Sequence, residues 1–393
     1  MPNLPPNPPP AANSPQSPQP INIAGFSDLK QKIQTYPLTQ LVDLIFAGAV
    51  SVAASDIHLE PEENNARLRF RVDGVLQDIA VLPKQNYLNL RDRIKFLAKL
   101  KTNITDTPQD GRFEQMINGQ KVDFRVSSIP TNFGEAIEMR LLIQTASTLK
   151  LEQLGFSPED LKKIQTAVIK PNGMILNTGP TGSGKTTTLY SILSVLNQPG
   201  RKIVTLEDPI EYELPGINQS QIEPESNYDF VAGLRSVLWQ DPDVIMIGEI
   251  RDIETAKTAL SAAVTGHLVL TTLHTNDATS ALPRLLDMGI EPYLLSGSIN
   301  LIIAQRLVRK IHRECAGKGC EICNHTGYKG RTVIAETLTI SEKIEALISR
   351  KASLSEFREA AKAEGMKTMY DDGLAKVAAG ITTKDEVERV TKA

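Results

Sequence analysis

The feature that most constrains this chain is a glycine-rich loop near its middle. Its eight residues match the pattern G-x-x-x-x-G-K-[ST] and read Gly179-Pro180-Thr181-Gly182-Ser183-Gly184-Lys185-Thr186. An apolar run, Met174–Asn177, precedes the loop, and a helix is expected from Thr187 to Leu196 directly after it. Glycines let backbone N–H groups approach phosphate oxygens, and the helix N-terminus adds partial positive charge. The loop, with Thr187 beside it, is therefore predicted to bind ATP. Lys185 would bridge the β- and γ-phosphates, and Thr186 would ligate Mg²⁺.

The sequence around this loop predicts a parallel sheet. Short apolar runs alternate with helical stretches after residue 160, and they are Met174–Asn177, Ile203–Leu206, Val244–Ile247 and Leu268–Thr272. Buried strands separated by helices are typical of a parallel sheet covered on both faces. We therefore expect an α/β domain over residues 161–393, with an insertion at about 310–330 and helices at the end.

The N-terminal part of the chain has a different character. Residues 1–20 hold nine of the 24 prolines and no charged side chain, so a disordered tail is expected over residues 1–21. Apolar and polar residues alternate in Arg67–Val72 and Lys121–Val126, and Asp73-Gly74 between such runs indicates a hairpin turn. These patterns predict a smaller α+β domain over residues 22–145, joined to the second domain by a linker over residues 146–160.

Composition excludes several classes of protein. The 393 residues are 41% hydrophobic and 23% charged, with a net charge of −3, which is typical of a soluble globular protein. The chain has no apolar run of the ~20 residues that span a bilayer and no secretion signal. Three cysteines, all between 315 and 323, do not form a disulfide framework, so we expect a cytoplasmic protein.

Two apolar runs end in carboxylates, where an open α/β sheet binds its ligand. Glu207, Asp208 and Glu211 follow the first run, and they could order Mg²⁺ waters or orient an attacking water. The second run ends at Gly248-Glu249 instead of the aspartate that usually ends such a strand. Either segment alone could be a solvated acidic loop, but both beside a P-loop favour a hydrolytic site.

A third apolar run is flanked by two histidines, His267 and His274, seven residues apart. A lone histidine is more often a packed residue than a catalytic one. A γ-phosphate sensor is the functional alternative for this pair.

In this order, these segments resemble the ATPases of type II secretion and type IV pilus assembly. In those families the P-loop is followed by an acidic "Asp box" (205–213 here), an atypical Walker B (241–252) and a "His box" (263–277). Further matches are 55–61, 108–112 and 380–383. The resemblance implies a RecA-like P-loop domain preceded by a smaller PAS-like α+β domain, in a homohexameric ring. One departure is Trp239, where the family usually has a basic residue before Gln-Asp-Pro-Asp.

The resemblance also implies roles for individual residues. Glu211 would polarise the attacking water and Glu249 would act through Mg²⁺ or the water network. His267 and His274 would report the γ-phosphate. Arginines from the N-terminal domain would reach the phosphates, since guanidinium groups stabilise the transition state of phosphoryl transfer; they are Arg112 and Arg125, with Arg140 less firmly assigned. The alternative for each arginine is a solvent-facing strand residue.

The cysteines form a candidate metal site with a nearby histidine. His312-x-x-Cys315-x₄-Cys320-x-x-Cys323 has ligand pairs at zinc-knuckle spacing. Four protein ligands would make the Zn²⁺ structural, with His325 as a rival fourth ligand and unliganded thiols as the alternative. Retraction motors of the family usually lack this cluster and carry Ser after the P-loop Lys. The cysteines and Thr186 therefore favour an assembly motor.

Several functions stay open at this stage. The first is a motor for pilus or pseudopilus assembly or type II secretion, acting on an inner-membrane platform protein and reaching the membrane through that partner. A retraction or DNA-uptake motor is the second, and a nucleotide-binding ring without turnover is another. A RecA-like nucleic-acid-binding protein is disfavoured by the negative net charge and by an aromatic content of 5%, so no direct contact with nucleic acid is expected.

Overall fold

A computed structural model describes residues 21–143 and 149–392, which form two compact units. The expected proline-rich tail lies outside the described residues except for Ile21. Each unit has its own sheet and its own hydrophobic core. Among the described residues, no helix has the combination of length and apolar character that crossing a membrane requires.

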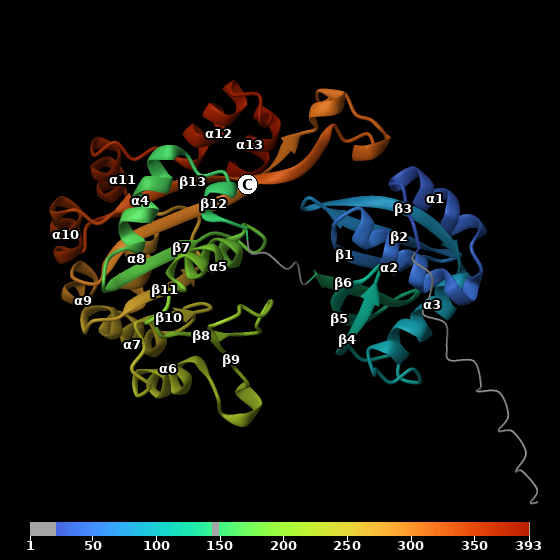
Figure 1. Cartoon of the computed structure of the whole chain (residues 1–393), viewed down its shortest axis with the longest axis horizontal. Coiled ribbons are helices and arrows are strands. Elements are labelled where there is room, and N and C mark those ends of the chain that lie inside the picture. The colour runs from blue at the N-terminus through green and yellow to red at the C-terminus, as the bar shows by residue number, and fades with distance from the viewer. Residues whose placement is uncertain (1–20, 144–148, 393) are drawn as a thin grey trace, which may run out of the picture. The chain divides into compact units, whose positions relative to one another are not determined.

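The N-terminal unit is a six-stranded sheet with three helices (Figure 1). The helices are α1 (Phe26–Thr35), α2 (Leu41–Ser51) and α3 (Lys84–Leu97). The strands are β1 (Ala54–Pro61), β2 (Asn65–Val72), β3 (Val75–Pro83), β4 (Gln109–Ile117), β5 (Gln120–Thr131) and β6 (Gly134–Ile143). They lie in the order β3-β2-β1-β6-β5-β4, and the pairs from β2 to β4 are antiparallel.

Alternating burial explains why this sheet carries helices on one side. Phe124 on β5 and Phe70 on β2 are fully buried, whereas the residues between buried positions are partly exposed. Phe46 of α2 packs against Phe124 with ring centroids 4.6 Å apart. One face of the sheet is therefore the core, and the other carries polar and charged side chains.

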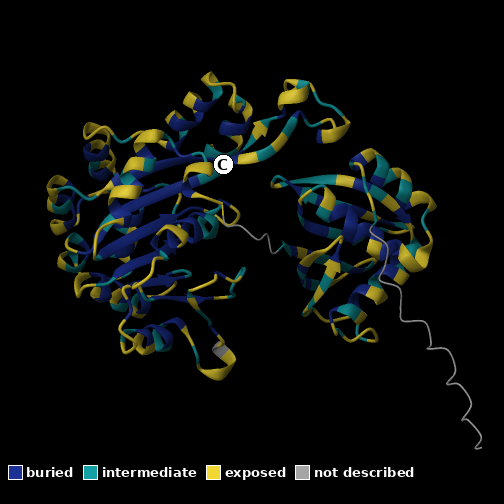
Figure 2. Ribbon diagram, in the orientation of Figure 1, coloured by how far each residue is buried: buried dark blue, intermediate teal, exposed yellow. Residues whose placement is uncertain are grey.

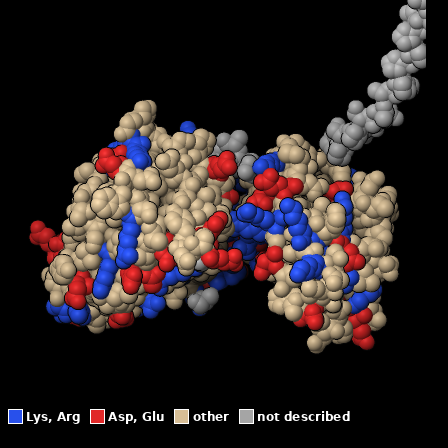
Figure 3. All heavy atoms as spheres, turned by 90° about the horizontal axis from the view of Figure 1, so that it is seen from below, with Lys and Arg blue, Asp and Glu red and all other residues tan. Residues whose placement is uncertain are grey.

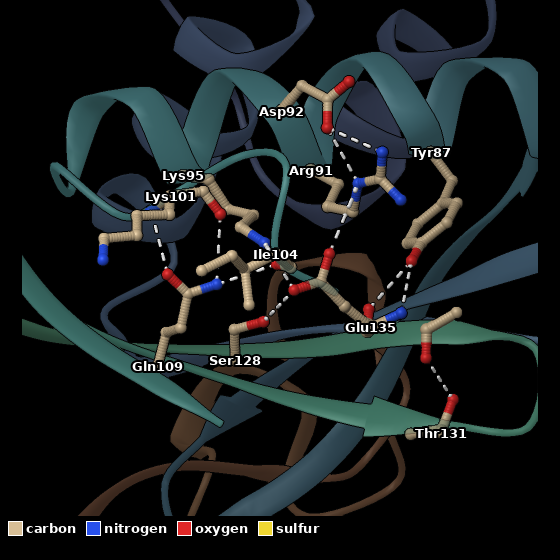
Figure 4. Close-up of polar contacts among 11 residues, drawn as sticks. Tyr87, Arg91, Asp92, Lys95, Lys101, Ile104, Gln109, Ser128, Thr131 and Glu135 are labelled. Atoms are coloured by element: carbon tan, nitrogen blue, oxygen red, sulfur yellow. Dashed lines mark hydrogen bonds and ion pairs between the residues drawn. The ribbon is translucent and has the colours of Figure 1, made fainter. Parts of the chain in front are cut away.

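A buried polar network also ties α3 to the sheet (Figure 4). Lys95 and Glu135 are both almost inaccessible to solvent, and their charged groups are 2.5 Å apart. Ser128 Oγ donates to the same carboxylate at 2.9 Å, and the Tyr87 hydroxyl donates to the Glu135 carbonyl at 2.9 Å. Burying these charges is tolerated because each is paired and hydrogen-bonded.

The C-terminal unit contains the predicted parallel sheet. Its strands are β7 (Gly173–Thr178), β8 (Ile203–Glu207), β9 (Asn218–Gln221), β10 (Val244–Ile247), β11 (Leu268–Leu273), β12 (Ile299–Ile311) and β13 (Tyr328–Thr339). The strand order is β13-β12-β7-β11-β10-β8-β9, and β13 is antiparallel to β12 whereas the other neighbours are parallel. The predicted fold class, a parallel-rich P-loop domain after a smaller α+β region, is confirmed.

Helices cover both faces of this sheet. They are α4 (Pro158–Val168), α5 (Lys185–Leu196), α6 (Phe230–Leu238), α7 (Ile253–Val264), α8 (Ala281–Asp287), α9 (Pro292–Ser296), α10 (Glu342–Ser349), α11 (Leu354–Ala363), α12 (Met369–Ala378) and α13 (Lys384–Thr391). Side chains of α4 and α5 form one core layer, and those of α6 and α7 form the other. The strands between them are buried along almost their whole length (Figure 2).

Most of the predicted linker over residues 146–160 belongs to the C-terminal unit. Residues 149–160 pack onto the C-terminal unit, and Leu151, Leu154 and Phe156 are buried in the same core layer as α5. Polar residues and Gly155 suggested a linker, but the apolar residues among them are the ones that the core buries. Residues 146–148 of the predicted linker lie outside the described residues.

Candidate functional site

The P-loop lies between β7 and α5 and has the backbone that its glycines allow. Gly182 and Gly184 have φ angles of 78° and 88°, in the left-handed region that glycine adopts at little cost. A Cβ at Gly179 would lie 2.7 Å from both the Gln305 carbonyl oxygen and Ser183 Oγ. These positions require glycine, so the loop keeps the open cradle of backbone that a phosphate needs.

Lys185 begins α5 and folds back over the loop. Its ammonium donates to the carbonyls of Gly179 at 2.8 Å and Pro180 at 3.1 Å. Burial lowers the Lys185 pKa below its usual value, an effect that nearby Arg306 adds to and Glu249 partly offsets. Among the described residues, Ser183 Oγ is a buried hydroxyl without a hydrogen-bond partner. A phosphate would supply acceptors to both groups, so the loop fits a nucleotide.

A buried glutamine on β12 braces this loop. Gln305 Nε2 donates to the Ser183 carbonyl at 2.8 Å, and its Oε1 accepts from Asn177 Nδ2 at 3.0 Å and from Thr188 Oγ1 at 2.8 Å. Gln305 thus joins the strand before the loop, the loop and the helix after it. Sequence reasoning missed this residue because only the fold brings β12 beside β7.

Glu249 and His274 meet at the carboxyl edge of the sheet, next to the P-loop strand. His274 Nε2 lies 2.9 Å from the Glu249 carboxylate, and Arg251 Nε donates to the same carboxylate at 2.6 Å. Burial opposes ionisation of Glu249, but these two partners outweigh it and hold its pKa below the usual value. Arg251 also pairs with Asp208 at 3.4 Å. Two of the predicted carboxylates, Glu249 and Asp208, thus share Arg251 as a partner. No sequence pattern had indicated a role for this arginine.

His267, in contrast, is not beside the phosphates of its own P-loop. It precedes β11, whereas His274 follows it, and β11 runs parallel to the P-loop strand β7. Six strand residues at ~3.3 Å each put about 20 Å between the two edges. The His267 ring Nδ1 bonds the Ala262 carbonyl at 3.0 Å instead. The structure therefore does not bring His267 to this subunit's own P-loop, because the two ends of one strand lie at opposite edges of the sheet.

Glu207 also faces away from the loop. Its side chain is buried, and its carboxylate accepts hydrogen bonds from Tyr190, Thr205 and Gln219. The structure therefore places the Glu207 carboxylate against α5, β8 and β9 rather than against the P-loop. Glu211, four residues later, is partly exposed.

The predicted arginines lie in one row across the N-terminal sheet. Cross-strand register pairs Arg112 with Arg125, Arg125 with Arg140, Arg140 with Asp56, and Asp56 with Arg71. Directly paired residues share a face of the sheet. The buried Asp56 carboxylate contacts Arg140 Nε at 2.8 Å and Arg71 Nε at 3.3 Å.

The row therefore consists of four arginines and one aspartate on the face of the sheet opposite the core. Lys and Arg side chains also gather on part of this unit's surface (Figure 3). Arg71 was missed, although the Arg67–Val72 alternation placed it on the same side as Arg69 and Arg67. Its pairing with Asp56 needs the strand register.

The cysteine cluster lies where β12 and β13 extend beyond the other strands as a hairpin (Figure 1). Ligand atoms of His312, Cys315, Cys320 and Cys323 all lie within 4.8 Å of one another. Sγ of Cys323 is 3.9 Å from that of Cys315 and 3.7 Å from that of Cys320. Zn–S bonds of ~2.3 Å in a tetrahedron give sulfur–sulfur distances of about 3.8 Å.

His312 Nδ1 completes the cluster at 3.4 Å from both Cys315 Sγ and Cys320 Sγ. Burial raises the pKa of the Cys323 thiol, but the N–H groups of Cys320 and Gly327 outweigh it and lower the pKa to about 6. His325, the rival ligand, is exposed and outside the cluster. The four residues fit a tetrahedral zinc ion.

Comparison with known proteins identifies the family. The family model "Type II/IV secretion system protein" matches residues 31–389. The type II secretion system protein HxcR of Pseudomonas aeruginosa is 45% identical over 379 residues, covering 94% of this chain and 81% of HxcR. The type IV pilus assembly ATPase PilB of Myxococcus xanthus is 44% identical over 380 residues, covering 89% of this chain and 67% of PilB.

Solved structures agree with these relatives. The Legionella pneumophila ATPase DotB superposes with a TM-score of 0.69 at 25% identity, over 89% of this chain and 95% of DotB. The pilus retraction motor PilT with bound ADP gives 0.63 at 29% identity, over 89% and 97% of the two chains. The chain belongs to the type II/IV secretion system protein family, the ATPases that its P-loop, Asp box and His box resemble.

Proposed function

We propose that this chain is the ATP-hydrolysing subunit of a homohexameric motor that assembles pili or pseudopili or drives type II secretion. The convergence of Lys185, Glu249, Arg251 and His274 at the carboxyl edge of the sheet carries this proposal. A cradle for phosphates, an ionised carboxylate and cationic partners are the groups that phosphoryl transfer to water requires.

The chain's own residues would divide the work of hydrolysis. Backbone N–H groups of the P-loop, except at Pro180, and the Lys185 ammonium would bind the β- and γ-phosphates, and Thr186 would hold Mg²⁺ at the start of α5. The ion, when bound, neutralises charge on the phosphate oxygens. Glu211 accepts a proton from the attacking water, while Glu249, kept ionised by Arg251 and His274, orders the surrounding polar groups.

The arginine row of the N-terminal unit would complete the site. Arg112 and Arg125 lie side by side in register and present guanidinium groups that can bind phosphate oxygens in a bidentate manner. We assign them the stabilisation of negative charge that develops during hydrolysis. Arginines supplied by a separate unit would couple hydrolysis to movement of that unit.

Zn²⁺ would have a structural role at the cysteine cluster. Its four ligands leave no open position for catalysis, and they join two short turns at the end of a long hairpin. This cluster and the 44–45% identity to HxcR and PilB, against 29% to PilT, favour an assembly or secretion motor over a retraction motor.

We place the motor in the cytoplasm, at the inner membrane, and assign its output to a membrane-embedded platform protein. The membrane contact would come through that partner, because none of the described helices is suited to span a bilayer. A direct role in nucleic-acid binding is not favoured by the relatives named above.

Lys185→Ala tests hydrolysis itself. The purified wild type should turn over Mg·ATP, and the variant should lose at least about 100-fold of this rate because the charge nearest the transferred phosphoryl group is gone. The mass of the particle with a non-hydrolysable ATP analogue, measured by light scattering, should be six-fold that of one chain. A wild type that binds ATP without turnover would instead be a structural nucleotide-binding ring.

A further inference from the structure

The Tyr190 hydroxyl is buried and forms hydrogen bonds with several segments that surround the P-loop helix. Tyr190 lies on α5, five residues after Lys185, and its side chain is completely buried. The hydroxyl donates a hydrogen bond to the Glu207 carboxylate at the end of β8. Burial and the charge of Glu207 both raise the Tyr190 pKa, so the phenol stays neutral and remains a donor.

The same hydroxyl oxygen also accepts from the segment that follows β8. The backbone N–H of Glu211 donates to it at 3.4 Å, and Gln219 Nε2 lies at the same distance. Tyr190 therefore connects the helix that begins at the P-loop with the backbone of the residue to which we assign the attacking water.

Gln219 on β9 makes a second set of connections to this segment. Its Nε2 donates to the Glu207 carboxylate and to the Tyr212 carbonyl, both at 3.1 Å. Its Oε1 accepts from the Leu214 N–H at 2.6 Å. Residues 208–214 contain no helix or strand, so their backbone depends on such side-chain bonds for its position.

We propose that Tyr190, Glu207 and Gln219 act as one buried unit of positioning residues that sets where Glu211 stands relative to the P-loop. The unit acts through the Glu211 backbone, and the inference rests on the proposed hydrolytic role of Glu211. A misplacement of ~1 Å in such a group can cost on the order of 10²-fold in rate, even when the substrate still binds.

Tyr190→Phe tests this unit by removing one hydroxyl. The expected result is a kcat about 10- to 100-fold lower, with KM for ATP and Kd for a fluorescent ADP analogue both close to wild type. Tyr87→Phe is the matched control, because Tyr87 is also fully buried and also bonds both a backbone N–H and an oxygen, at Glu135 in the N-terminal unit. Equal kcat in the two variants, or a rise in KM alone, would overturn the proposal.

Gln219→Ala and the double variant with Tyr190→Phe test whether the residues act together. The double variant should be no slower than the slower single variant, since both act through one unit. Multiplied single effects would mean independent roles and would contradict the inference. Gln219 is only partly buried, so Gln219→Ala can test the positioning role even if Tyr190→Phe fails to fold.

Hydrogen exchange separates this inference from the proposed function. Amides of residues 208–214 should exchange faster in Tyr190→Phe than in Tyr87→Phe, whether or not the protein hydrolyses ATP. A wild type without turnover refutes the proposed function, whereas unchanged exchange in this segment refutes the positioning unit.

Discussion

The two edges of the parallel sheet carry similar residues, but these residues bond to different partners. At the carboxyl edge, Glu249 and His274 contact each other and lie beside the P-loop strand. At the amino edge, Asp243 accepts from the Lys202 backbone N–H at 2.6 Å, and His267 bonds the Ala262 carbonyl. A carboxylate and a histidine occur at both edges, and at the carboxyl edge the two side chains contact each other.

This difference shows that the role of a residue next to a strand depends on the edge of the sheet at which it lies. Side chains at the carboxyl edge bond to side chains from neighbouring strands, so they form a site that a ligand can rearrange. Those at the amino edge bond backbone groups of the helix or loop that precedes a strand, which is a structural role. Proximity in sequence is therefore a poor guide when a strand lies between two residues, as it does for His267 and His274.

Glu249→Gln should produce the largest difference between the edges. The change keeps the size of the side chain but removes the charge that Arg251 and His274 stabilise, so ATP should bind and turnover should fall by about 10²- to 10³-fold. Asp243→Asn at the opposite edge is the control and should keep turnover within about threefold of wild type. Near-normal turnover of Glu249→Gln, measured as phosphate release at saturating ATP, would refute its role.

Arg112→Ala and Arg125→Ala extend the comparison to the other unit, with a smaller expected effect. Each should lower kcat by about 10- to 100-fold while ADP affinity changes less, because the guanidinium groups stabilise charge that appears during hydrolysis. Lys121→Ala, on the same strand as Arg125 but outside the row, should retain full activity. Unchanged turnover in both arginine variants would leave the row as a surface feature only.

Removal of zinc should have the smallest effect at the nucleotide site. Elemental analysis should find one zinc ion per chain, and Cys320→Ser should lower both the zinc content and the melting temperature. ADP affinity should stay near wild type, since the hairpin end is separate from the P-loop. A full-length protein purified without chelators that contains no zinc would contradict the assignment.

Residues adjacent to an unmistakable backbone motif were predictable from sequence. The P-loop, its strand and its helix follow from the glycine spacing and the apolar run, and the cysteine cluster follows from ligand spacing. The parallel sheet follows from short buried runs between helices. The loop and the cysteine cluster follow from local spacing, and the sheet follows from the alternation of buried runs with helices.

Side-chain direction and register were not predictable in the same way. Glu207 ends a strand as expected, but whether it faces the ligand or the interior depends on Tyr190 and Gln219, which other elements supply. Arg71 joins the arginine row only through pairing with Asp56, and Gln305 reaches the P-loop only because β12 lies beside β7. These contacts are set by packing between segments far apart in the chain.

Nucleotide preference in His274→Ala and His267→Ala distinguishes the two edges of the sheet as the place of the nucleotide site. The affinities of each variant for Mg·ADP and for a non-hydrolysable Mg·ATP analogue would be measured by competition with a fluorescent nucleotide. We expect His274→Ala to reduce the preference for the ATP analogue, because His274 contacts Glu249 at the carboxyl edge. His267→Ala should leave this preference within about twofold of wild type. Loss of that preference in His267→Ala with its retention in His274→Ala would contradict the placement of the site at the carboxyl edge.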